Sequence, residues 1–173
     1  GRAGTGLNFR TNLYFAETRD AGAMWTNAAG EKLSLPLRSA ENPALVRDYR
    51  REDLSVYLKD IAFTASGQPV ILYLTSKGFN PGPASGPFQW HTARWDGRVW
   101  VFRPCVTSDH NYDHGSLAIE SDGTWRLIAP TEPGPQPWGT GGEMVMWTSR
   151  DEGATWERAR QLTHDSRFNH TYA

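Results

Sequence analysis

Histidine and tyrosine side chains occur as close pairs at two places in this sequence. Tyr112 and His114 lie two residues apart in the polar stretch 108–115. His170 and Tyr172 repeat the pair in reverse order near the end of the sequence. An imidazole exchanges protons near neutral pH, and a phenol donates a proton where a nearby charge lowers its pKa. We therefore predict general acid–base chemistry, with His114, His170 and Tyr172 as the candidate catalytic residues.

Other residues could bind a substrate without reacting with it. Lys59 could neutralise an anionic group, and Trp138 could stack on the apolar face of a sugar ring. His110 and Tyr112 belong to the same polar stretch as His114. The candidate substrate-binding residues are Lys59, His110, Tyr112 and Trp138. The structural alternatives are a satisfied imidazole for each histidine, an internally paired or solvated lysine, and a tryptophan packed within its own loop.

Two further chemistries are weakly indicated around His110. The spacing of His110 and His114 could suit a metal, with Asp109 and Asp113 as added ligands, but no full ligand set is evident. Ser108, Asp109 and His110 are the residue types of a catalytic triad, yet adjacent residues cannot adopt its geometry. We expect no cofactor and no metal, with a structural divalent cation as the alternative. The single cysteine, Cys105, is expected to be a small buried hydrophobe.

The elements that position these residues are indicated by a repeated turn motif. Residues 149–156 read S-x-D-x-G-x-T-W, and residues 18–25 form a weaker copy with Thr for Ser and Met for Thr. In such a turn, hydroxyl and carboxylate oxygens accept backbone N–H groups, glycine supplies the backbone conformation, and tryptophan fixes the returning strand. The residues expected to have this structural role are Asp20, Gly22, Trp25, Ser149, Asp151, Gly153 and Trp156.

Strand-like runs alternate with turn signals along the chain, and no segment shows a sustained helical period. Successive units are expected to start near Tyr57, Asp113 and Asn169. Lys59 and His114 are 55 residues apart (114 − 59), and His114 and His170 are 56 apart (170 − 114). A regularly repeated four-stranded unit is typical of a propeller blade, and a β-sandwich is the alternative.

The sequence thus predicts an all-β protein, with one partial β-propeller domain over residues 1–173. We expect about two complete four-stranded blades plus parts of two others. The expected units are a blade part at 1–40, blades at 55–104 and 112–162, and the start of a next blade at 168–173. A propeller needs at least four blades to close. We therefore expect a fragment of a longer propeller, with seven blades in the parent and six as the alternative.

Loop lengths distinguish the two ends of the expected blades. The turns that follow the first and third strands of each blade are short, whereas the loops at 76–87, 104–111, 131–142 and 163–169 are long. Because strands alternate in direction, the long loops share one end of the blades, which we call the long-loop rim. Function is commonly carried by loops on a rigid scaffold. The long-loop rim is therefore the candidate site, opposite the turns at Asp20 and Asp151.

Composition excludes several classes of partner. The chain has 173 residues with 18 Lys and Arg against 19 Asp and Glu, giving a net charge of −1. A nucleic-acid-binding or anionic-membrane-binding surface would need a basic excess. No run of about 18 apolar residues could span a membrane. We expect neither nucleic acid nor membrane as a partner.

Four segments resemble the BNR-4 type Asp-box propellers, a group that includes the propeller ulvan lyases and related rhamnosyl-uronide-cleaving enzymes. The four segments are Tyr112–Leu117, Ile128–Pro135, Gly141–Met144, and Leu162–Asp165 together with Asn169–Tyr172. The likeness extends over nearly the whole chain, and its more specific parts are the strand starts at His114–Ser116 and Asn169–Tyr172.

The resemblance implies a polysaccharide lyase that cleaves a uronic-acid-containing glycan by β-elimination. It places His114 and His170 at the histidine positions around the axial mouth, with Tyr172 as the matching tyrosine. It also implies an arginine that neutralises the uronate, for which this chain has no clear counterpart, so Lys59 or an arginine elsewhere would take that role. The implied protein acts on a polysaccharide or oligosaccharide, is secreted or periplasmic, and is a monomer when full length.

Two other function classes fit the same fold, because fold alone does not decide function. A rhamnosidase-like or sialidase-like glycoside hydrolase would use paired carboxylates, for which Glu132 and Glu143 are the obvious candidates. A sialidase would also need an arginine cluster at the strand starts, and the sequence lacks one. A non-catalytic glycan-binding or protein-binding propeller would use the same rim.

Overall fold

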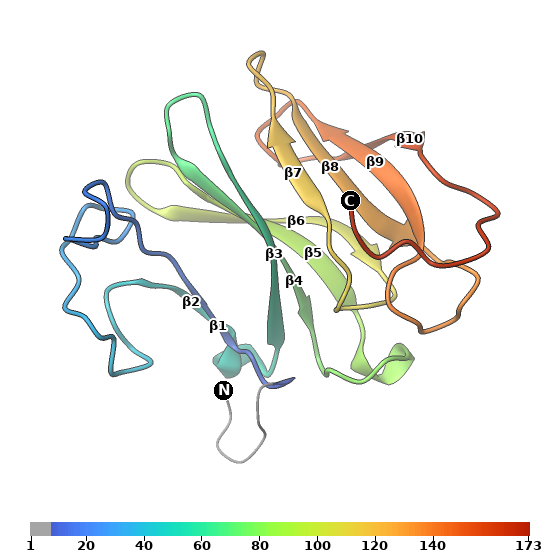
Figure 1. Cartoon of the computed structure of the whole chain (residues 1–173), viewed down its shortest axis with the longest axis horizontal. Helices are drawn as coiled ribbons and strands as arrows, with labels where there is room; N and C mark the ends of the chain where they lie inside the picture. The colour runs from blue at the N-terminus through green and yellow to red at the C-terminus, as the bar shows by residue number, and fades with distance from the viewer. Residues whose placement is uncertain (1–7) are drawn as a thin grey trace.

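The computed structural model describes residues 8–173, which form three antiparallel sheets (Figure 1). The first complete sheet contains β3 (Ser55–Phe63), β4 (Pro69–Ser76), β5 (Phe88–Trp95) and β6 (Trp100–Ser108). The second contains β7 (Ser116–Ile119), β8 (Trp125–Glu132), β9 (Glu143–Ser149) and β10 (Glu157–Gln161). The third sheet pairs β1 (Asn12–Tyr14) with β2 (Leu45–Asp48). Short 3-10 helices lie at η2 (Tyr49–Glu52) and η3 (Pro83–Ser85).

Both complete sheets are four-stranded meanders. Each strand pairs antiparallel with the next one in sequence, in the orders β3-β4-β5-β6 and β7-β8-β9-β10. This arrangement confirms the expected pair of four-stranded units. Within residues 8–173, no helix has the length and apolar character that crossing a membrane requires.

The unit boundaries differ in detail from the expected ones. The first strand of the first sheet starts at Ser55, before the expected start at Tyr57. The first strand of the second sheet starts at Ser116, after the expected start at Asp113. Near the expected third start at Asn169, the chain forms a single bridge between Gly142 and His170 instead of a strand.

The N-terminal sheet extends beyond the expected limit at residue 40. The charged run at 47–53 contributes to β2 and then forms the single helical turn η2. The reason is Tyr49, which is 2% exposed and whose hydroxyl lies 2.6 Å from that of Tyr73. The Arg47 guanidinium covers the Tyr49 ring, with 4.4 Å between its carbon and the ring centroid. Arg50 and Arg51 of this run thus face outward, while its tyrosine is buried.

Strand β4 is the centre of the packing because it is buried on both faces. Alternate side chains of a strand point to opposite faces. Val70, Leu72 and Leu74 belong to the core between the two complete sheets. Ile71 and Tyr73 belong to a second core, which β3 to β5 share with the N-terminal sheet. The continuous apolar run PVILYL at the start of β4 is the sequence signature of this two-sided burial.

Tryptophans fill part of the core between the complete sheets. Trp90 is the most deeply buried of them, and Trp125 is 2% exposed. Trp156 packs at the edge of Trp125, with the ring centroids 6.5 Å apart. Trp25 of the first turn motif is only partly buried.

The second turn motif forms the hydrogen bonds expected of it. Ser149 Oγ accepts from Gly153 N at 2.9 Å and donates to Asp151 Oδ1 at 2.8 Å. Asp151 also accepts from the backbone N–H and the hydroxyl of Thr155. Gly153 has a φ of +81°. The carboxylate and hydroxyl therefore satisfy backbone groups that a tight turn would otherwise leave unpaired.

The first turn motif has the same wiring. Gly22 N donates to Thr18 Oγ1 at 2.9 Å, and Met24 N donates to Asp20 Oδ1 at 2.8 Å. Gly22 has a φ of +92°. In the second motif the Thr155 hydroxyl also donates to the Asp151 carboxylate. Met24 occupies the position of Thr155 in the first motif and has no hydroxyl, so it cannot donate such a bond to Asp20. The replacement of Ser by Thr and of Thr by Met is therefore compatible with the same turn.

Long and short connections lie at opposite ends of the complete sheets (Figure 1). The turns β3–β4, β5–β6, β7–β8 and β9–β10 are at one end, and the last of these contains Asp151. The connections at 77–87, 109–115 and 133–142 are at the other. The expected asymmetry is confirmed for these sheets, and the long-loop rim is separate from the turn at Asp151.

Replacing Gly153 by alanine is expected to destabilise the protein more than the same change at Gly123. Both glycines have a positive φ, +81° and +85°, which costs an L-residue about 1–2 kcal/mol. A Cβ at Gly153 would also lie 2.9 Å from the Trp125 ring, whereas at Gly123 it would meet nothing within 4 Å. Chemical denaturation of the two variants measures the difference. Equal losses would contradict a packing role for Gly153.

The stabilising effect of Asp151 is expected to depend on pH. Hydrogen bonds from the Thr155 hydroxyl, the Thr155 N–H and the Ser149 hydroxyl lower the pKa of Asp151 from 3.8 to about 2. A carboxylate with a lowered folded-state pKa stabilises the fold above its unfolded pKa and loses that effect as pH falls. The melting temperature of Asp151→Ala should therefore be below wild type at neutral pH. The gap should narrow between pH 3.8 and about 2, and a constant gap would contradict this account.

Candidate functional site

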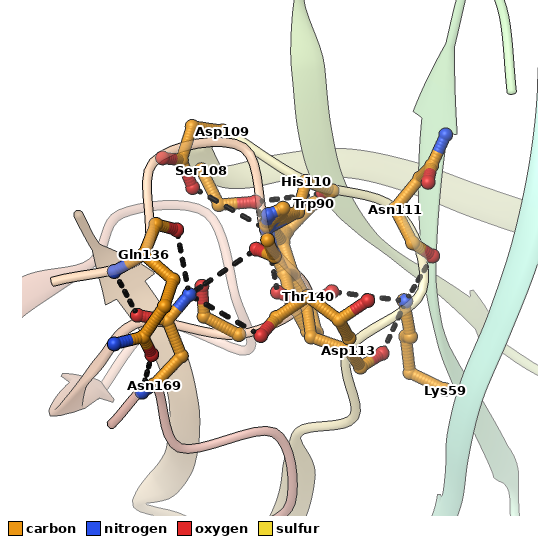
Figure 2. Close-up of polar contacts among 12 residues, drawn as sticks. Lys59, Trp90, Ser108, Asp109, His110, Asn111, Asp113, Gln136, Thr140 and Asn169 are labelled. Atoms are coloured by element: carbon orange, nitrogen blue, oxygen red, sulfur yellow. Dashed lines mark hydrogen bonds and ion pairs between the residues drawn. The ribbon is translucent and has the colours of Figure 1, made fainter. Parts of the chain in front are cut away.

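The connection from β6 to β7 is anchored by a buried ion pair between the two complete sheets. Lys59 lies on β3, and Asp113 precedes β7; their side chains are 2% and 0% exposed. Lys59 Nζ lies 3.3 Å from Asp113 Oδ1 and donates to the carbonyls of Asn111 and Asp113 (Figure 2). It also lies over the Trp90 ring at 5.2 Å from the centroid. One side chain of β3 therefore holds the connection through three oxygen atoms.

Burial disfavours the charged form of both members of this pair. Desolvation lowers the pKa of Lys59, and the nearby Asp113 offsets part of that effect. Desolvation likewise raises the pKa of Asp113, and the charge of Lys59 is the main opposing influence. Each group therefore depends on the other to remain charged, as expected for a buried ion pair.

The anchored connection directs its residues alternately inward and outward. Asn111, Asp113 and Gly115 are buried, whereas Tyr112 and His114 are exposed. Asn111 Nδ2 donates to Gly78 O at 3.1 Å, which fixes the inward side to the β4–β5 loop. A Cβ on Gly115 would lie 2.8 Å from that of Ala129, so glycine is needed at this crossing. Tyr112 and His114 are thus both presented on the outside of the connection.

His114 lies against the C-terminal segment. Its backbone N–H donates to Thr171 O at 2.9 Å, and its ring centroid is 5.4 Å from that of Tyr172. Ser116 Oγ donates to Ala173 O at 2.8 Å, so the two segments run side by side. Tyr172 is 77% exposed. An imidazole and a phenol from different segments are therefore brought together at the surface.

Tyr112 packs against Tyr57 on β3, the first strand of the neighbouring sheet. Its ring lies 5.4 Å from that of Tyr57 in an edge-on arrangement, and its hydroxyl donates to Asn8 Oδ1 at 3.2 Å. Burial raises the pKa of Tyr57 to about 12, so Tyr57 stays protonated at neutral pH. Tyr112 is 40% exposed and remains available to a ligand on this surface.

His170 is held by a chain of polar side chains that the sequence did not reveal. Its Nε2 lies 3.0 Å from Ser166 Oγ, which in turn donates to Glu143 Oε2 at 2.9 Å. Desolvation raises the pKa of Glu143, but hydrogen bonds from the Thr163 hydroxyl and from Ser166 outweigh it and keep the pKa below the ordinary value. Glu143 is 6% exposed and ionised. Its carboxylate accepts hydrogen bonds from the segment before His170 and is not presented at the surface.

The loop 133–142 is fastened to the same C-terminal segment. Asn169 Oδ1 accepts from Gln136 N at 3.0 Å, and Asn169 N donates to Gln136 Oε1 at 2.7 Å (Figure 2). Gly142 and His170 exchange two backbone hydrogen bonds at 3.0 and 2.9 Å. Trp138, at the tip of this loop, is 45% exposed and has a φ of +60°. Its indole is accessible to a ligand, as the predicted stacking role requires.

Two of the predicted substrate-binding residues are inaccessible. Lys59 is internally paired, which was the structural alternative considered for it. His110 is 5% exposed, with Nδ1 3.4 Å from Asp109 Oδ1 and 3.9 Å from Asp113 Oδ2. Burial therefore opposes a direct substrate contact for either residue. Tyr112 and Trp138 keep the exposure that such a contact needs.

The surroundings of Ser108, His110 and Cys105 bear on the triad, metal and thiol chemistries considered from the sequence. Ser108 Oγ accepts from the Trp90 indole N–H at 2.9 Å and donates to His110 O, so it is not paired with an imidazole as a nucleophile would be. In the described part of the chain, no group of three or more His, Cys, Asp or Glu residues could hold a metal ion. Burial raises the pKa of Cys105 to about 12, in keeping with an unreactive thiol.

The paired carboxylates that a hydrolase would use are already engaged. Glu132 and Glu143 are register partners on β8 and β9. Glu132 pairs with Arg158 at 3.2 Å, and Glu143 accepts hydrogen bonds from Thr163 and Ser166. A general acid or nucleophile must be free to reach the scissile bond. Their engagement makes this pair a poor candidate for glycoside hydrolysis.

Comparison with known proteins supports the fold. No protein-family model and no curated protein matches the chain. Its structure is similar to that of a PL25 ulvan lyase, described as a new family of polysaccharide lyase, with a TM-score of 0.66 and 21% identity over 90% of this chain. A structure of this ulvan lyase bound to -[GlcA(1-4)Rha3S]- matches with the same values. The chain spans 34% of the length of each.

This likeness defines the class of fold to which the described residues belong. They form an all-β, open part of a β-propeller, with two complete four-stranded blades and the N-terminal sheet as part of another. The C-terminal segment lies beside the start of β7. The β-sandwich alternative is therefore set aside.

Breaking the buried ion pair from one side is expected to destabilise the protein strongly. Lys59→Met leaves the Asp113 carboxylate buried without its cation, a change that costs about 3–5 kcal/mol. Lys59→Met combined with Asp113→Asn should recover part of the loss, because no unpaired charge remains. The exposed Lys77 offers a control, and Lys77→Met should change the free energy of unfolding by less than about 0.5 kcal/mol. Similar losses for Lys59→Met and Lys77→Met would contradict the anchoring role.

Proposed function

We propose that this chain is part of the propeller of a polysaccharide lyase, which cleaves a uronic-acid-containing glycan by β-elimination. The observation that carries the proposal is the contact between His114 and Tyr172, 5.4 Å apart on the exposed surface of the long-loop rim. An imidazole and a phenol are the acid–base pair that this reaction needs near neutral pH. The likeness to an ulvan lyase fold supports it independently. Membership of the BNR-4 type Asp-box propellers is part of the same proposal.

The reaction assigns a role to each exposed group. A base removes the proton from C5 of the uronate, and the C–H electron pair forms the C4–C5 double bond. The C4–O4 bond breaks as an acid protonates the leaving oxygen. His114 or His170 acts as the base, and Tyr172 acts as the acid. These residues share the segments joined by the bond from His114 N to Thr171 O, which supports their joint action.

Neutralisation of the uronate carboxylate requires a cation other than Lys59. The C5 proton is acidic enough to remove only when the negative charge of the neighbouring carboxylate is offset. Because Lys59 is committed to Asp113, we assign this role to an arginine of the complete propeller. The complete protein is inferred to have seven blades, and the span of 34% of the ulvan lyase chain supports a longer parent.

The substrate side of the proposal follows from the exposed aromatic residues. Tyr112 and Trp138 offer ring faces on which sugar rings stack, and both are at least 40% exposed. A polysaccharide or oligosaccharide is the proposed partner, with no cofactor. We further propose that the full-length protein is a secreted or periplasmic monomer, because a long polysaccharide outside the cell cannot reach an enzyme that stays inside.

A glycan-binding propeller without catalysis is the second candidate. It is favoured by the same exposed aromatic residues, which could hold a sugar without any proton transfer. Ultraviolet absorbance separates the candidates, because a lyase leaves an unsaturated uronide and a hydrolase does not. New reducing ends without this absorbance would indicate a hydrolase, and binding without either product would indicate a binding propeller.

His114→Ala in the complete propeller is expected to lower turnover by about 10²–10⁴-fold, the usual range for one acid–base group. The substrate would be a polysaccharide of the -[GlcA(1-4)Rha3S]- type, which is bound by the similar ulvan lyase. His164→Ala is the matched control, because His164 is exposed on the same rim and pairs only with Asp165 in the described residues. Wild-type turnover by a folded His114→Ala variant would remove His114 from the mechanism.

A further inference from the structure

The hydrogen-bonded series Glu143–Ser166–His170 has only one arrangement of its hydrogen atoms that satisfies every contact. Glu143 Oε1 accepts from the backbone N–H of Ser166 at 2.8 Å, and Oε2 accepts from the Thr163 hydroxyl. Ser166 Oγ lies 2.9 Å from Glu143 Oε2 and 3.0 Å from His170 Nε2. An ionised carboxylate can only accept hydrogen bonds, and a serine hydroxyl carries one hydrogen. The hydrogen between Ser166 and Glu143 must therefore belong to Ser166.

The position of the serine hydrogen also determines which atom donates in the bond between Ser166 and His170. With its hydrogen directed at Glu143, Ser166 Oγ presents a lone pair to His170 Nε2. A bond at 3.0 Å then requires the hydrogen to be on Nε2. In a neutral imidazole one nitrogen donates and the other accepts, so the lone pair lies on Nδ1. This tautomer is assigned from the hydrogen-bond network, as protein tautomers generally are.

We propose that Glu143 and Ser166 are positioning residues that fix His170 in the Nε2–H tautomer, with Nδ1 as its proton-accepting atom. The tautomer itself follows from the hydrogen bonds among Glu143, Ser166 and His170. Its catalytic use rests on the proposed function, in which His170 is a candidate base for the C5 proton. When Nδ1 takes that proton, the ring becomes a cation whose Nε2–H still donates to Ser166. The buried carboxylate of Glu143 stabilises this cation through the serine hydroxyl.

Glu143→Gln tests the proposal by reversing the direction of the hydrogen bonds. The backbone N–H of Ser166 still needs an acceptor at the Oε1 position, so the amide oxygen occupies that place. The amide nitrogen then takes the Oε2 position and donates to Ser166 Oγ. The serine hydroxyl turns to donate to His170 Nε2, and the ring hydrogen moves to Nδ1. We expect the tautomer to switch from Nε2–H to Nδ1–H.

Long-range ¹H–¹⁵N correlation of the ¹⁵N-labelled chain measures the tautomer directly, at a pH where the imidazole is neutral. His170→Gln identifies the signals of His170 by their loss. Glu132→Gln is the matched control, because it makes the same change at the register partner of Glu143, and it should leave the Nε2–H tautomer in place. An Nδ1–H tautomer in the wild type, or an unchanged tautomer in folded Glu143→Gln, would overturn the proposal.

Ser166→Ala is the second variant, should Glu143→Gln not fold. Without the hydroxyl, Nε2 loses its fixed acceptor, and His170 should show a mixture of both tautomers. A single Nε2–H tautomer in folded Ser166→Ala would refute the proposal. The lyase assay is separate from these spectra: an inactive propeller with the predicted tautomers would refute the proposed function alone. Conversely, lyase activity with unchanged tautomers would refute only the role of Glu143 and Ser166.

Discussion

The buried ion pair between Lys59 and Asp113 is the constraint on which the arrangement of the rim depends. A charged amine and a carboxylate can both be buried only when each is paired and hydrogen-bonded. Lys59 belongs to the inner strand of one blade, and Asp113 precedes the inner strand of the next. Asp60, the neighbour of Lys59, also accepts from the backbone N–H of Leu117 at 2.8 Å. The two blades are therefore fixed in register where their inner strands meet, and the position of His114 follows from that register.

Apolar packing supplies the rigidity behind this contact. The alternate side chains of β4 enter two separate cores, so the first blade is held on both faces. Interiors packed in this way deform little. The connections of the long-loop rim are fastened to the scaffold by polar side chains, as Asn111 fastens one to Gly78 and Asn169 joins another to Gln136. Apolar cores thus set the geometry of the blades, and buried polar groups set the geometry of the loops.

Most of the fold could be predicted from the sequence, because its signals are local. The two turn motifs, the short hairpin turns and the alternating strands each act within a few residues, and together they specified the blades. The contacts missed were those made between distant segments. Lys59 and Asp113 are 54 residues apart, and Ser166 and Glu143 are 23 apart. A lysine is almost always exposed, so nothing near Lys59 in the sequence indicates its burial. The strand β2 was missed for a related reason: charged residues surround Tyr49, the residue that follows β2, and nothing local indicates that it is buried.

Whether a polar residue can act chemically depends on which of its atoms are already occupied. Lys59 and Glu143 have the residue types of a substrate clamp and a hydrolytic acid, but their atoms are engaged by neighbours. His114 and Tyr172 combine exposure with mutual contact. In His170, the bond to Ser166 occupies Nε2, which leaves Nδ1 as the second ring nitrogen. These three residues lie on segments joined by backbone hydrogen bonds, so their backbone positions are fixed relative to one another. The proposed acid–base role needs such a fixed backbone together with exposed side chains, and residue type alone would not have distinguished these groups from Lys59 or Glu143.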